Sequence, residues 1–468
     1  MERLSVPPIS NARFSNPGDI MFNKILIANR GEIAVRVIRA CRDLGIVSVA
    51  VCSDADRESL HALLADECLC IGSAFSKDSY LNMDAVLTAA LLAGADAIHP
   101  GYGFLSENSE FARRCEDNGI AFIGPSHKSI DLMGDKAQAR DTVVKAGVPV
   151  IPGSDGVTDD LQSAKAVAEK IGYPVLVKAA SGGGGKGIRA AGSESELEGA
   201  ITAAKAEAQA NFGDSRIYIE KLIISPRHIE FQILSDKFGN TVHLFERDCS
   251  VQRRHQKMIE EAPSPHITPE VRDKMGAAAV NAAKAASYTG AGTIEFLVDA
   301  DENFYFMEMN TRIQVEHPVT EAITGIDLIR AQIEIAAGLP LRFGQSDIKL
   351  LGCAMECRIN AEDTSRNFAP SPGTVNSFNV PGGLGIRVDT AIYQGYTVPP
   401  YYDSMLAKLI VSGASRDEVI SRMKRALSEF IVEGIPTNVD YQMSIMMDPV
   451  FASGDYDIDF IDKYFSKL

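Results

Sequence analysis

Short apolar runs alternate with amphipathic stretches along the first part of the chain. Residues 25–28 are an apolar run, residues 32–44 carry apolar side chains at helical spacing, and residues 47–51 form a second apolar run. A strand, a helix and a strand in this order predict the βαβ opening of a parallel sheet. The same alternation continues to residues 120–123, so a doubly wound domain is predicted there. The first turn lacks a G-x-G-x-x-G pattern, and a nicotinamide-binding role is therefore not indicated.

The pattern changes beyond residue 136. Residues 151–222 combine a helical stretch, an apolar run that ends in Lys178, and a glycine run, which together have the size of a small lid. From residue 226 onward, alternating strands and helices predict a larger α+β body. Residues 351–358 and 383–411 predict a strand-rich tail packed on that body.

The glycine run at residues 181–187 reads SGGGGKG and follows a predicted buried strand. Glycines leave backbone N–H groups free to approach phosphate oxygens, and Lys186 adds a positive charge. Gly187 stands where a Walker A loop needs Ser or Thr, and a strand-like stretch follows instead of a helix. The run predicts a mobile flap over a nucleotide, with a flexible connector as the alternative. Lys178 favours the flap, because a lysine beside it is well placed to meet an α-phosphate.

Carboxylates interrupt two apolar strands further along the chain. Glu295 lies in the run 293–297, and Glu308 follows the run 304–307. If the two strands are antiparallel neighbours, these side chains meet, and together with the Asn310 oxygen they suit Mg²⁺ or Mn²⁺ bridging nucleotide phosphates. The alternative is a salt bridge, which is the commoner fate of a lone buried Glu.

A period of two extends this row of polar side chains. It predicts that Arg312, Gln314 and Glu316 continue on the face that carries Glu308 and Asn310. Charges aimed at a core need a metal, an anion or one another.

A dense group of basic side chains lies at residues 247–257, on both sides of Cys249. In an acidic protein this segment predicts a site for a small anion such as a carboxylate or bicarbonate, with a solvated face as the alternative. Because no Cys-His-Asn arrangement supports a nucleophile, Cys249 is predicted to be a buried, inert thiol.

Length and charge narrow the class of protein. The 468 residues predict about three domains, at roughly 150 residues per domain. A formal net charge of -16 argues against a nucleic-acid or anionic-membrane binder. Eight cysteines without repeated C-x-x-C pairs fit a reducing cytoplasm, and the uncharged run 85–95 is too short to span a bilayer. Residues 1–20 lack a secretory signal and are expected to be a disordered extension.

Four long phrases of the sequence together resemble one family, the biotin carboxylases of the ATP-grasp superfamily. IANRGEIA, HPGYGFLSEN, ERDCSVQRRHQK and EMNTRIQVEHP lie at residues 27–34, 99–108, 246–257 and 308–318. The resemblance runs from Met21 to about Leu468. It implies an ATP-grasp fold of the α/β and α+β classes, with an N-terminal doubly wound parallel-sheet domain and a C-terminal strand-rich biotin carboxylase domain.

The resemblance also implies the activity and the domain limits. A member makes carboxyphosphate from ATP and bicarbonate and passes CO₂ to N1 of biotin on a carrier protein. The implied domains are 21–135, an ATP-grasp domain at 136–350 with 151–222 as its mobile lid, and 351–468. The expected cofactors are ATP and Mg²⁺ or Mn²⁺, with biotin as a carrier-bound substrate that is not attached to this chain.

Positions that match the family's motifs give the implied site residues. Glu295, Glu308 and Asn310 match metal ligands, and Glu316 matches the base that deprotonates bicarbonate. Arg358 matches the arginine that stabilises the biotin enolate, in keeping with the value of a fixed guanidinium where negative charge develops. The positions implied for bicarbonate, biotin and catalysis are Lys257, Arg312, Gln314, Val315, Glu316, Arg358 and Tyr102. The positions implied for ATP are Lys136, Lys178, Gly184, Gly185, Glu220, Lys221, Leu222, Ile223, His228, Gln252 and His255.

Two departures and two alternatives accompany the resemblance. Lys186 stands where an arginine is frequent, and residues 1–20 have no counterpart in the shortest members. One alternative is another ATP-grasp ligase that activates a different carboxylate, which would not need Lys257, Glu316 and Arg358 together. The other is a catalytically silent nucleotide sensor, which would be expected to lose a metal ligand or Lys257.

The chain contains no Ala-Met-Lys-Met biotinylation signal. The carrier protein and the carboxyltransferase are therefore expected on separate chains. The first expectation is an acetyl-CoA carboxylase of fatty acid synthesis that is built from several subunits, with a two-subunit pyruvate or propionyl-CoA carboxylase as the alternative. A cytoplasmic homodimer is expected by resemblance, without nucleic-acid or membrane partners.

Overall fold

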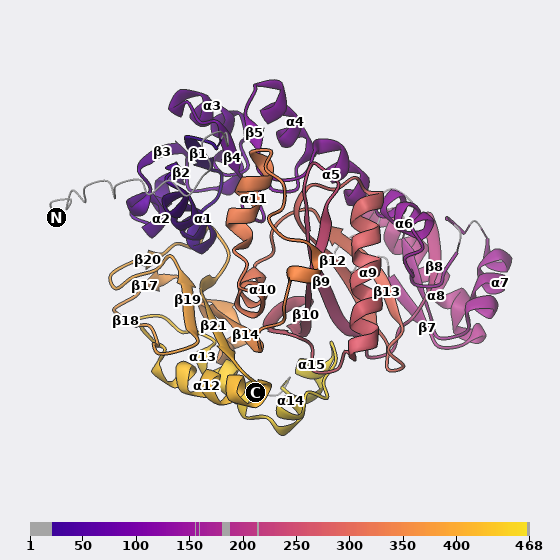
Figure 1. The fold of residues 1–468 in the computed structure, drawn as a ribbon. Helices are drawn as coiled ribbons and strands as arrows, with labels where there is room; N and C mark the ends of the chain where they lie inside the picture. The colour runs from indigo at the N-terminus through magenta and orange to yellow at the C-terminus, as the bar shows by residue number, and fades with distance from the viewer. Residues whose placement is uncertain (1–20, 155, 159, 180–187, 213–214, 466–468) are drawn as a thin grey trace.

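The computed structural model describes residues 21–154, 156–158, 160–179, 188–212 and 215–465. Figure 1 shows an N-terminal unit, a small unit at the far side of the molecule, and a large central sheet whose strands continue into the C-terminal part of the chain. The extension expected at residues 1–20 and the glycines Gly184 and Gly185 of the expected flap lie outside the described residues.

The N-terminal unit is built on a parallel sheet with the strand order β3-β2-β1-β4-β5. Ile25, Leu26 and Ile27 of its central strand are fully buried, because helices cover both faces of the sheet. The predicted doubly wound domain is thereby confirmed. The elements are β1 (Lys24–Ile27), α1 (Gly31–Leu44), β2 (Val47–Ser53), η1 (Asp54–Asp56), α2 (Leu60–Leu64), β3 (Glu67–Gly72), η2 (Ser76–Asp78), α3 (Met83–Ala93), β4 (Ala97–His99), α4 (Ser109–Asp117) and β5 (Ala121–Phe122).

Two helices lead from this unit into the small unit predicted as a lid. Three antiparallel strands in the order β7-β6-β8 carry two helices on one face and enclose a hydrophobic core of their own. A separate core is what a unit needs to move as one body, and the lid movement stays a prediction. The elements are α5 (His127–Gly134), α6 (Lys136–Lys145), α7 (Leu161–Ile171), β6 (Val175–Ala179), β7 (Ile188–Ala191), α8 (Glu194–Phe212) and β8 (Ile217–Lys221).

The central sheet has eight antiparallel strands in the order β13-β12-β9-β10-β11-β14-β21-β19. The sheet contains strands from both sides of residue 350, the expected limit of the ATP-grasp domain. β11 pairs with β14 in a register that places Glu260 opposite Glu356. The predicted strand-rich tail is thus hydrogen-bonded into the sheet of the body. The strands are β9 (Arg227–Ser235), β10 (Thr241–Arg253), β11 (Gln256–Ala262), β12 (Gly290–Val298), β13 (Phe304–Asn310), β14 (Cys353–Asn360), β19 (Ile386–Thr390) and β21 (Met405–Gly413).

Helices cover the two ends of the central sheet. α9 (Pro269–Ala285) packs on β9 and β12 through a cluster around Phe231 and Phe296, and α12 (Arg416–Glu429) packs on β14 and β21. The remaining helices are α10 (His317–Thr324), α11 (Leu328–Ala336), η3 (Gln345–Asp347), η4 (Thr364–Arg366), α13 (Val439–Met447), α14 (Pro449–Ser453) and α15 (Phe460–Tyr464). Short strand pairs complete the C-terminal part at β15 (Glu362–Asp363), β16 (Ala369–Pro370), β17 (Gly373–Thr374), β18 (Ser377–Asn379), β20 (Thr397–Val398) and β22 (Ile431–Glu433).

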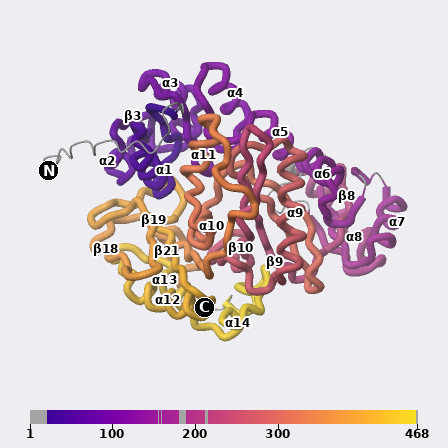
Figure 2. Tube along the Cα trace, viewed as in Figure 1, coloured from indigo at the N-terminus to yellow at the C-terminus, as the bar shows by residue number. Residues whose placement is uncertain are grey.

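The end of the chain returns to the start of β9 (Figure 2), where the Ile458 N–H donates to the Pro226 carbonyl at 3.0 Å. This contact ties the last helices to the strand that carries His228 and Glu230. In the described part of the chain, no helix has both the length and the apolar character of a membrane span.

Candidate active site

Lys257 lies at the centre of the polar face of the large sheet. Its Nζ contacts Glu230 Oε2 at 2.6 Å, Glu316 Oε1 at 2.8 Å and Glu295 Oε1 at 3.1 Å. All three carboxylates are buried. Glu230 and Glu295 stand opposite each other on β9 and β12, and Glu316 precedes α10, so three neighbouring elements deliver carboxylates to one ammonium group.

Burial and neighbouring charges set the protonation of this cluster. Burial disfavours the charged form of Lys257, but the carboxylates Glu230, Glu295 and Glu316 outweigh it and hold the pKa of the ammonium well above its ordinary value. Burial likewise opposes ionisation of Glu316, and Lys257 with Arg358 nevertheless holds its pKa well below the ordinary value. Glu316 is therefore a carboxylate at neutral pH.

Arg247 is the second cation of the cluster, and it is fully buried. Its Nε donates to Glu230 Oε1 at 2.5 Å, and its Nη atoms donate to Gln232 Oε1 at 2.8 Å and to the Thr320 and Thr293 hydroxyls at 2.9 and 3.1 Å. Every guanidinium bond is directed to a buried acceptor. Arg247 therefore holds Glu230 in place rather than facing a ligand.

The basic side chains of the segment 247–257 point in different directions. Arg247 and Lys257 point into the sheet face, whereas Arg253 lies at the hairpin between β10 and β11, where it donates to Asn367 Oδ1 at 2.7 Å. Cys249 is buried, and burial raises the pKa of its thiol well above the ordinary value, in agreement with an inert thiol. The basic side chains are thus divided between the sheet face and the β10–β11 turn, and the binding of a small anion by this segment stays a prediction.

The three residues predicted as metal ligands come together on β12 and β13. Glu295 stands opposite Glu308, and Thr293 stands opposite Asn310. Asn310 Nδ2 donates to Glu295 Oε1 at 2.8 Å, and His228 Nε2 lies 2.9 Å from Glu295 Oε2. Possible ligand atoms of His228, Glu230 and Glu295 all lie within 4.8 Å of one another.

The contacts and the pKa of Glu308 show whether these residues fit a cation. Its carboxylate has no hydrogen bond or ion pair with any residue that the structure describes. Burial, followed by the charge of Glu295, raises the pKa of Glu308 above its ordinary value. Two facing carboxylates, one of them unpaired, are a donor set that fits a hard divalent cation such as Mg²⁺.

The polar row predicted beyond Asn310 is not a strand. β13 ends at Asn310, and Glu316 is the residue before α10. The prediction that a period of two continues to Glu316 is wrong there. The side chains still meet, because Arg312 Nη1 donates to Gln314 Oε1 at 2.6 Å and Arg312 Nη2 donates to Asn310 Oδ1 at 3.2 Å.

Glu107 was not predicted as a site residue, although it belongs to the phrase HPGYGFLSEN. Its Oε1 accepts from the Thr311 N–H at 3.0 Å, and its Oε2 accepts from Arg312 Nε at 3.0 Å. Glu107 thereby fixes the loop after β13 to the N-terminal unit. The sequence could have indicated Glu107 only through its place in a phrase that resembles the family, because the spacing of hydrophobic residues does not single it out.

Arg358 completes the site from the C-terminal part of the sheet. Its Nη2 donates to Glu316 Oε2 at 3.0 Å and its Nε donates to Glu260 Oε1 at 2.6 Å. On the next strand, Lys408 Nζ donates to the Val315 carbonyl at 2.8 Å and lies 3.1 Å from Glu32 Oε1. Tyr102, which was predicted to contact the substrate, donates a hydrogen bond from its hydroxyl to the same carboxylate of Glu32.

The described residues predicted for ATP lie on the lid, on α6, on β9 and at the hairpin between β10 and β11. Lys178 pairs with Glu220 across β6 and β8, and Lys221 Nζ donates to the Gly172 and Tyr173 carbonyls at 3.0 and 2.9 Å. Leu222 and Ile223 follow in the segment that joins β8 to β9. Lys136 begins α6, Gln252 stands opposite Lys257, and His255 lies in the β10–β11 turn.

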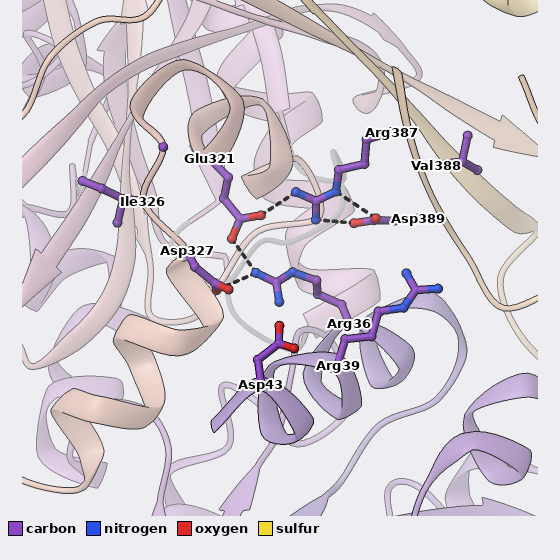
Figure 3. A pocket seen from close by; sticks show the side chains of 10 residues that line it. Arg36, Arg39, Asp43, Glu321, Ile326, Asp327, Arg387, Val388 and Asp389 are labelled. Carbon is purple, nitrogen blue, oxygen red and sulfur yellow. Dashed lines mark hydrogen bonds and ion pairs between the residues drawn. The ribbon is translucent and has the colours of Figure 1, made fainter. Parts of the chain in front are cut away.

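A cavity of about 440 Å³ lies away from these residues, between α1, α11 and β19. In it Glu321 bridges two arginines (Figure 3), at 2.8 Å from Arg36 Nη2 and 2.7 Å from Arg387 Nη1. None of the candidate site residues that the structure describes lines it. The Glu321 bridge joins the N-terminal unit to the edge of the central sheet.

Comparison with known proteins identifies relatives over nearly the whole chain. Three family models match: "Biotin carboxylase, N-terminal domain" at residues 21–130, "Carbamoyl-phosphate synthase L chain, ATP binding domain" at 135–343, and "Biotin carboxylase C-terminal domain" at 356–463. Biotin carboxylase 1 of Bacillus subtilis is 56% identical over 445 residues, which are 95% of this chain and 99% of that protein. One of the pyruvate carboxylase subunits of Methanothermobacter thermautotrophicus is 53% identical over 95% of this chain and 90% of its own.

A solved structure gives the same result. It is the biotin carboxylase domain dimer of the Hydrogenobacter thermophilus 2-oxoglutarate carboxylase in complex with MgADP, ADP and bicarbonate. Its TM-score with this chain is 0.87 at 51% sequence identity, over 95% of this chain and 98% of that one.

Replacement of Lys257 by Met should expose how much the buried cluster depends on this cation. Because Glu230, Glu295 and Glu316 would lose a shared partner, we expect a loss of about 3–5 kcal/mol in unfolding free energy near neutral pH. Wild-type Glu316 has a lowered pKa, so its stabilisation is present above the ordinary value of 4.5 and is lost below it. The difference between wild type and variant should therefore shrink as the pH falls from about 5 to about 3.

Urea unfolding of both proteins at the two pH values measures this effect. Lys284→Met, at an exposed position on α9, is the matched control and should change stability by less than about 0.5 kcal/mol. Equal differences at both pH values would contradict the assigned charge states.

Proposed function

We propose that this chain, which belongs to the biotin carboxylase family and is an ATP-dependent carboxylase, carboxylates N1 of biotin on a carrier protein by way of carboxyphosphate. The observation that carries the proposal is the setting of Glu316 between two cations. One of its oxygens lies 2.8 Å from Lys257 Nζ, and the other lies 3.0 Å from Arg358 Nη2. A buried carboxylate between a bicarbonate-side and a biotin-side cation suits a base that links two successive reactions.

In the first step, Glu316 takes the proton of bicarbonate. Its ionised state at neutral pH leaves it ready to accept, and Lys257 and Arg312 would hold the developing carbonate. A carbonate oxygen then attacks the γ-phosphorus of ATP, the bond to ADP breaks, and carboxyphosphate remains. The proton rests on Glu316.

In the second step, Arg358 supports the biotin ureido group. Protonation of Glu316 removes one of the two carboxylates that Arg358 contacts. Carboxyphosphate breaks its bond between the carboxyl carbon and the bridging oxygen to give CO₂ and phosphate, the phosphate takes the proton from N1, and N1 attacks CO₂. The guanidinium is then available for the negative charge that develops on the ureido oxygen. Tyr102, Gln314 and Val315 would line the space for bicarbonate and biotin.

Glu295, Glu308 and Asn310 would hold Mg²⁺ or Mn²⁺, and the ion would neutralise charge on the transferred phosphoryl group. The Hydrogenobacter relative was solved with MgADP and bicarbonate, which supports the same ligands here. The triphosphate would meet Lys136, Lys178 and the flap, and the nucleoside would meet the residues Glu220, Lys221, Leu222, Ile223, His228, Gln252 and His255. The lid at 151–222 would close over ATP and exclude water from carboxyphosphate.

For the complete assembly we propose an acetyl-CoA carboxylase built from several subunits, with carrier and carboxyltransferase on separate chains. The similarity to the Methanothermobacter pyruvate carboxylase, at 53% identity, favours a two-subunit pyruvate carboxylase as the second candidate. A homodimer is proposed because the Hydrogenobacter domain was solved as a dimer.

ADP release by the purified chain tests the proposed function. With Mg²⁺, ATP and bicarbonate, added free biotin should stimulate ADP release, and the stimulation should vanish when bicarbonate is removed. Turnover that ignores bicarbonate or biotin would instead indicate another ATP-grasp ligase.

Glu308→Gln tests the proposed metal site. Loss of one charged ligand should lower every ATP-dependent activity by about a hundredfold or more, because ~3 kcal/mol of charge stabilisation on the phosphates is lost. Raised Mg²⁺ concentration should restore part of the activity. Glu270→Gln, at an exposed position on α9, is the control. Full activity of the Glu308 variant at low Mg²⁺ would exclude this residue as a ligand.

Arg358→Ala tests the division between the two steps. Biotin carboxylation should fall by about a hundredfold, whereas bicarbonate-dependent ATP hydrolysis should fall far less. Arg416→Ala is a matched control, because it removes a comparable ion pair from Glu261, next to Glu260, at 2.7 Å. Equal loss of both activities in the Arg358 variant would contradict its assignment to the biotin step.

A further inference from the structure

Two glutamates beside Arg358 have no role in the mechanism above. Glu260 on β11 and Glu356 on β14 stand directly opposite each other in the antiparallel register, and both are fully buried. Glu356 and Arg358 lie two residues apart on one strand, so their side chains share a face of the sheet. Two carboxyl groups are thus enclosed next to the guanidinium that the biotin step requires.

The bonding of the two carboxyl groups differs. Glu260 Oε1 accepts from Arg358 Nε at 2.6 Å. Neither oxygen of Glu356 has a hydrogen-bond partner among the residues that the structure describes, and the same holds for Glu260 Oε2. Glu260 is therefore held by the guanidinium, whereas Glu356 is held by packing alone.

The charges that face Glu356 do not neutralise it by contact. They are Lys408 on β21, Glu260 on β11, Arg358 on β14 and Glu316 before α10. Lys408 directs its ammonium to the Val315 carbonyl and to Glu32, and Arg358 directs its donors to Glu260 and Glu316. An ionised carboxylate that is buried without a contacting partner is strongly disfavoured.

The pKa values of the pair agree with these contacts: Glu260, which contacts Arg358, ionises more readily than Glu356. Burial raises the pKa of Glu356 well above its ordinary value; Lys408 opposes this shift and Glu260 adds to it. Burial also raises the pKa of Glu260 to about 7, although Arg358 draws it down. Above about pH 7 the pair therefore carries one negative charge, and that charge is on the residue that contacts Arg358.

We propose that Glu356 remains a neutral carboxylic acid and that Glu260 is the positioning residue that holds Arg358 in place for the carboxylation of biotin. This inference rests on the function proposed above. When Glu316 accepts the bicarbonate proton, Arg358 loses its contact with a charged partner on that side, and Glu260 alone keeps the guanidinium in position. A third carboxylate at Glu356 would compete with the biotin enolate for the same cation.

Infrared spectroscopy tests the state of Glu356 without any turnover. At about pH 8, wild type should show the C=O stretch of a buried protonated carboxyl group that is absent from Glu356→Gln. The Glu270→Gln control should leave that band unchanged. A difference spectrum with a lost carboxylate band in its place would overturn the neutral state of Glu356.

The ratio of biotin carboxylation to bicarbonate-dependent ATP hydrolysis tests Glu260. Glu260→Gln should lower this ratio by about tenfold or more, and Glu356→Gln should keep it within about twofold of wild type. If Glu260→Gln folds poorly, Glu260→Asp keeps the charge at a shorter reach and should give an intermediate ratio. Equal effects of the Glu260 and Glu356 variants would overturn the proposal.

A pH profile and a double mutant separate positioning from a structural effect. The wild-type ratio should rise through about pH 7 as Glu260 ionises, and this step should be missing from Glu260→Gln. The charged and titratable groups that face Glu260 are Lys257 on its own strand, Cys249 on β10, Arg358 and Glu356 on β14, and Glu316.

In an Arg358→Ala background, Glu260→Gln should cause no further loss of the ratio, because the residue acts through Arg358. A further loss of the same size as in wild type would overturn the positioning role. If wild type ignores biotin altogether, the proposed function fails and the role of Glu260 in it fails as well. The infrared result would still decide the state of Glu356.

Discussion

The contact of one ammonium group with three buried carboxylates is the constraint on which the active-site architecture depends. Lys257 can neutralise Glu230, Glu295 and Glu316 together only if β9, β11, β12 and the start of α10 keep their register. A one-residue slip would turn a carboxylate into the apolar core. The charges to which the proposed chemistry is assigned thus also fix the geometry of the sheet. Removal of any one of them strongly destabilises the fold, because it leaves an unpaired buried charge.

Continuity of the central sheet would allow the two proposed reaction steps to share one base. β11 and β14 pair directly, so the carboxylates proposed to bind the metal and the arginine proposed to support biotin, Arg358, stand on one hydrogen-bonded sheet. Contacts from outside hold its loops: Glu107 fixes the segment after β13, and Glu321 joins α1 to β19 through two arginines. None of the contacts named here involves a described residue of the small unit, which has its own core and is proposed to move.

The sequence predicted best where a charge breaks a clear pattern. Glu295 and Glu308 interrupt apolar strands, and antiparallel pairing brought them together as expected. Glu230 and Glu260 were not predicted, because Glu230 shares an alternating strand with Gln232 and Glu260 sits in a charged run that reads as solvated. The row beyond Asn310 failed because β13 ends there and the loop that follows is bonded to Glu107, and periodicity contains no information on such long-range partners. The resemblance supplied the roles that spacing alone left open.

Transfer of oxygen from bicarbonate to phosphate is the most direct test of the central claim. If Glu316 deprotonates bicarbonate for attack on ATP, a bicarbonate oxygen becomes bonded to the γ-phosphorus and stays there when CO₂ leaves. Turnover with bicarbonate carrying a heavy oxygen isotope should therefore release inorganic phosphate that contains a single labelled oxygen, detected by mass spectrometry. Phosphate without the label, formed together with carboxybiotin, would contradict the carboxyphosphate mechanism.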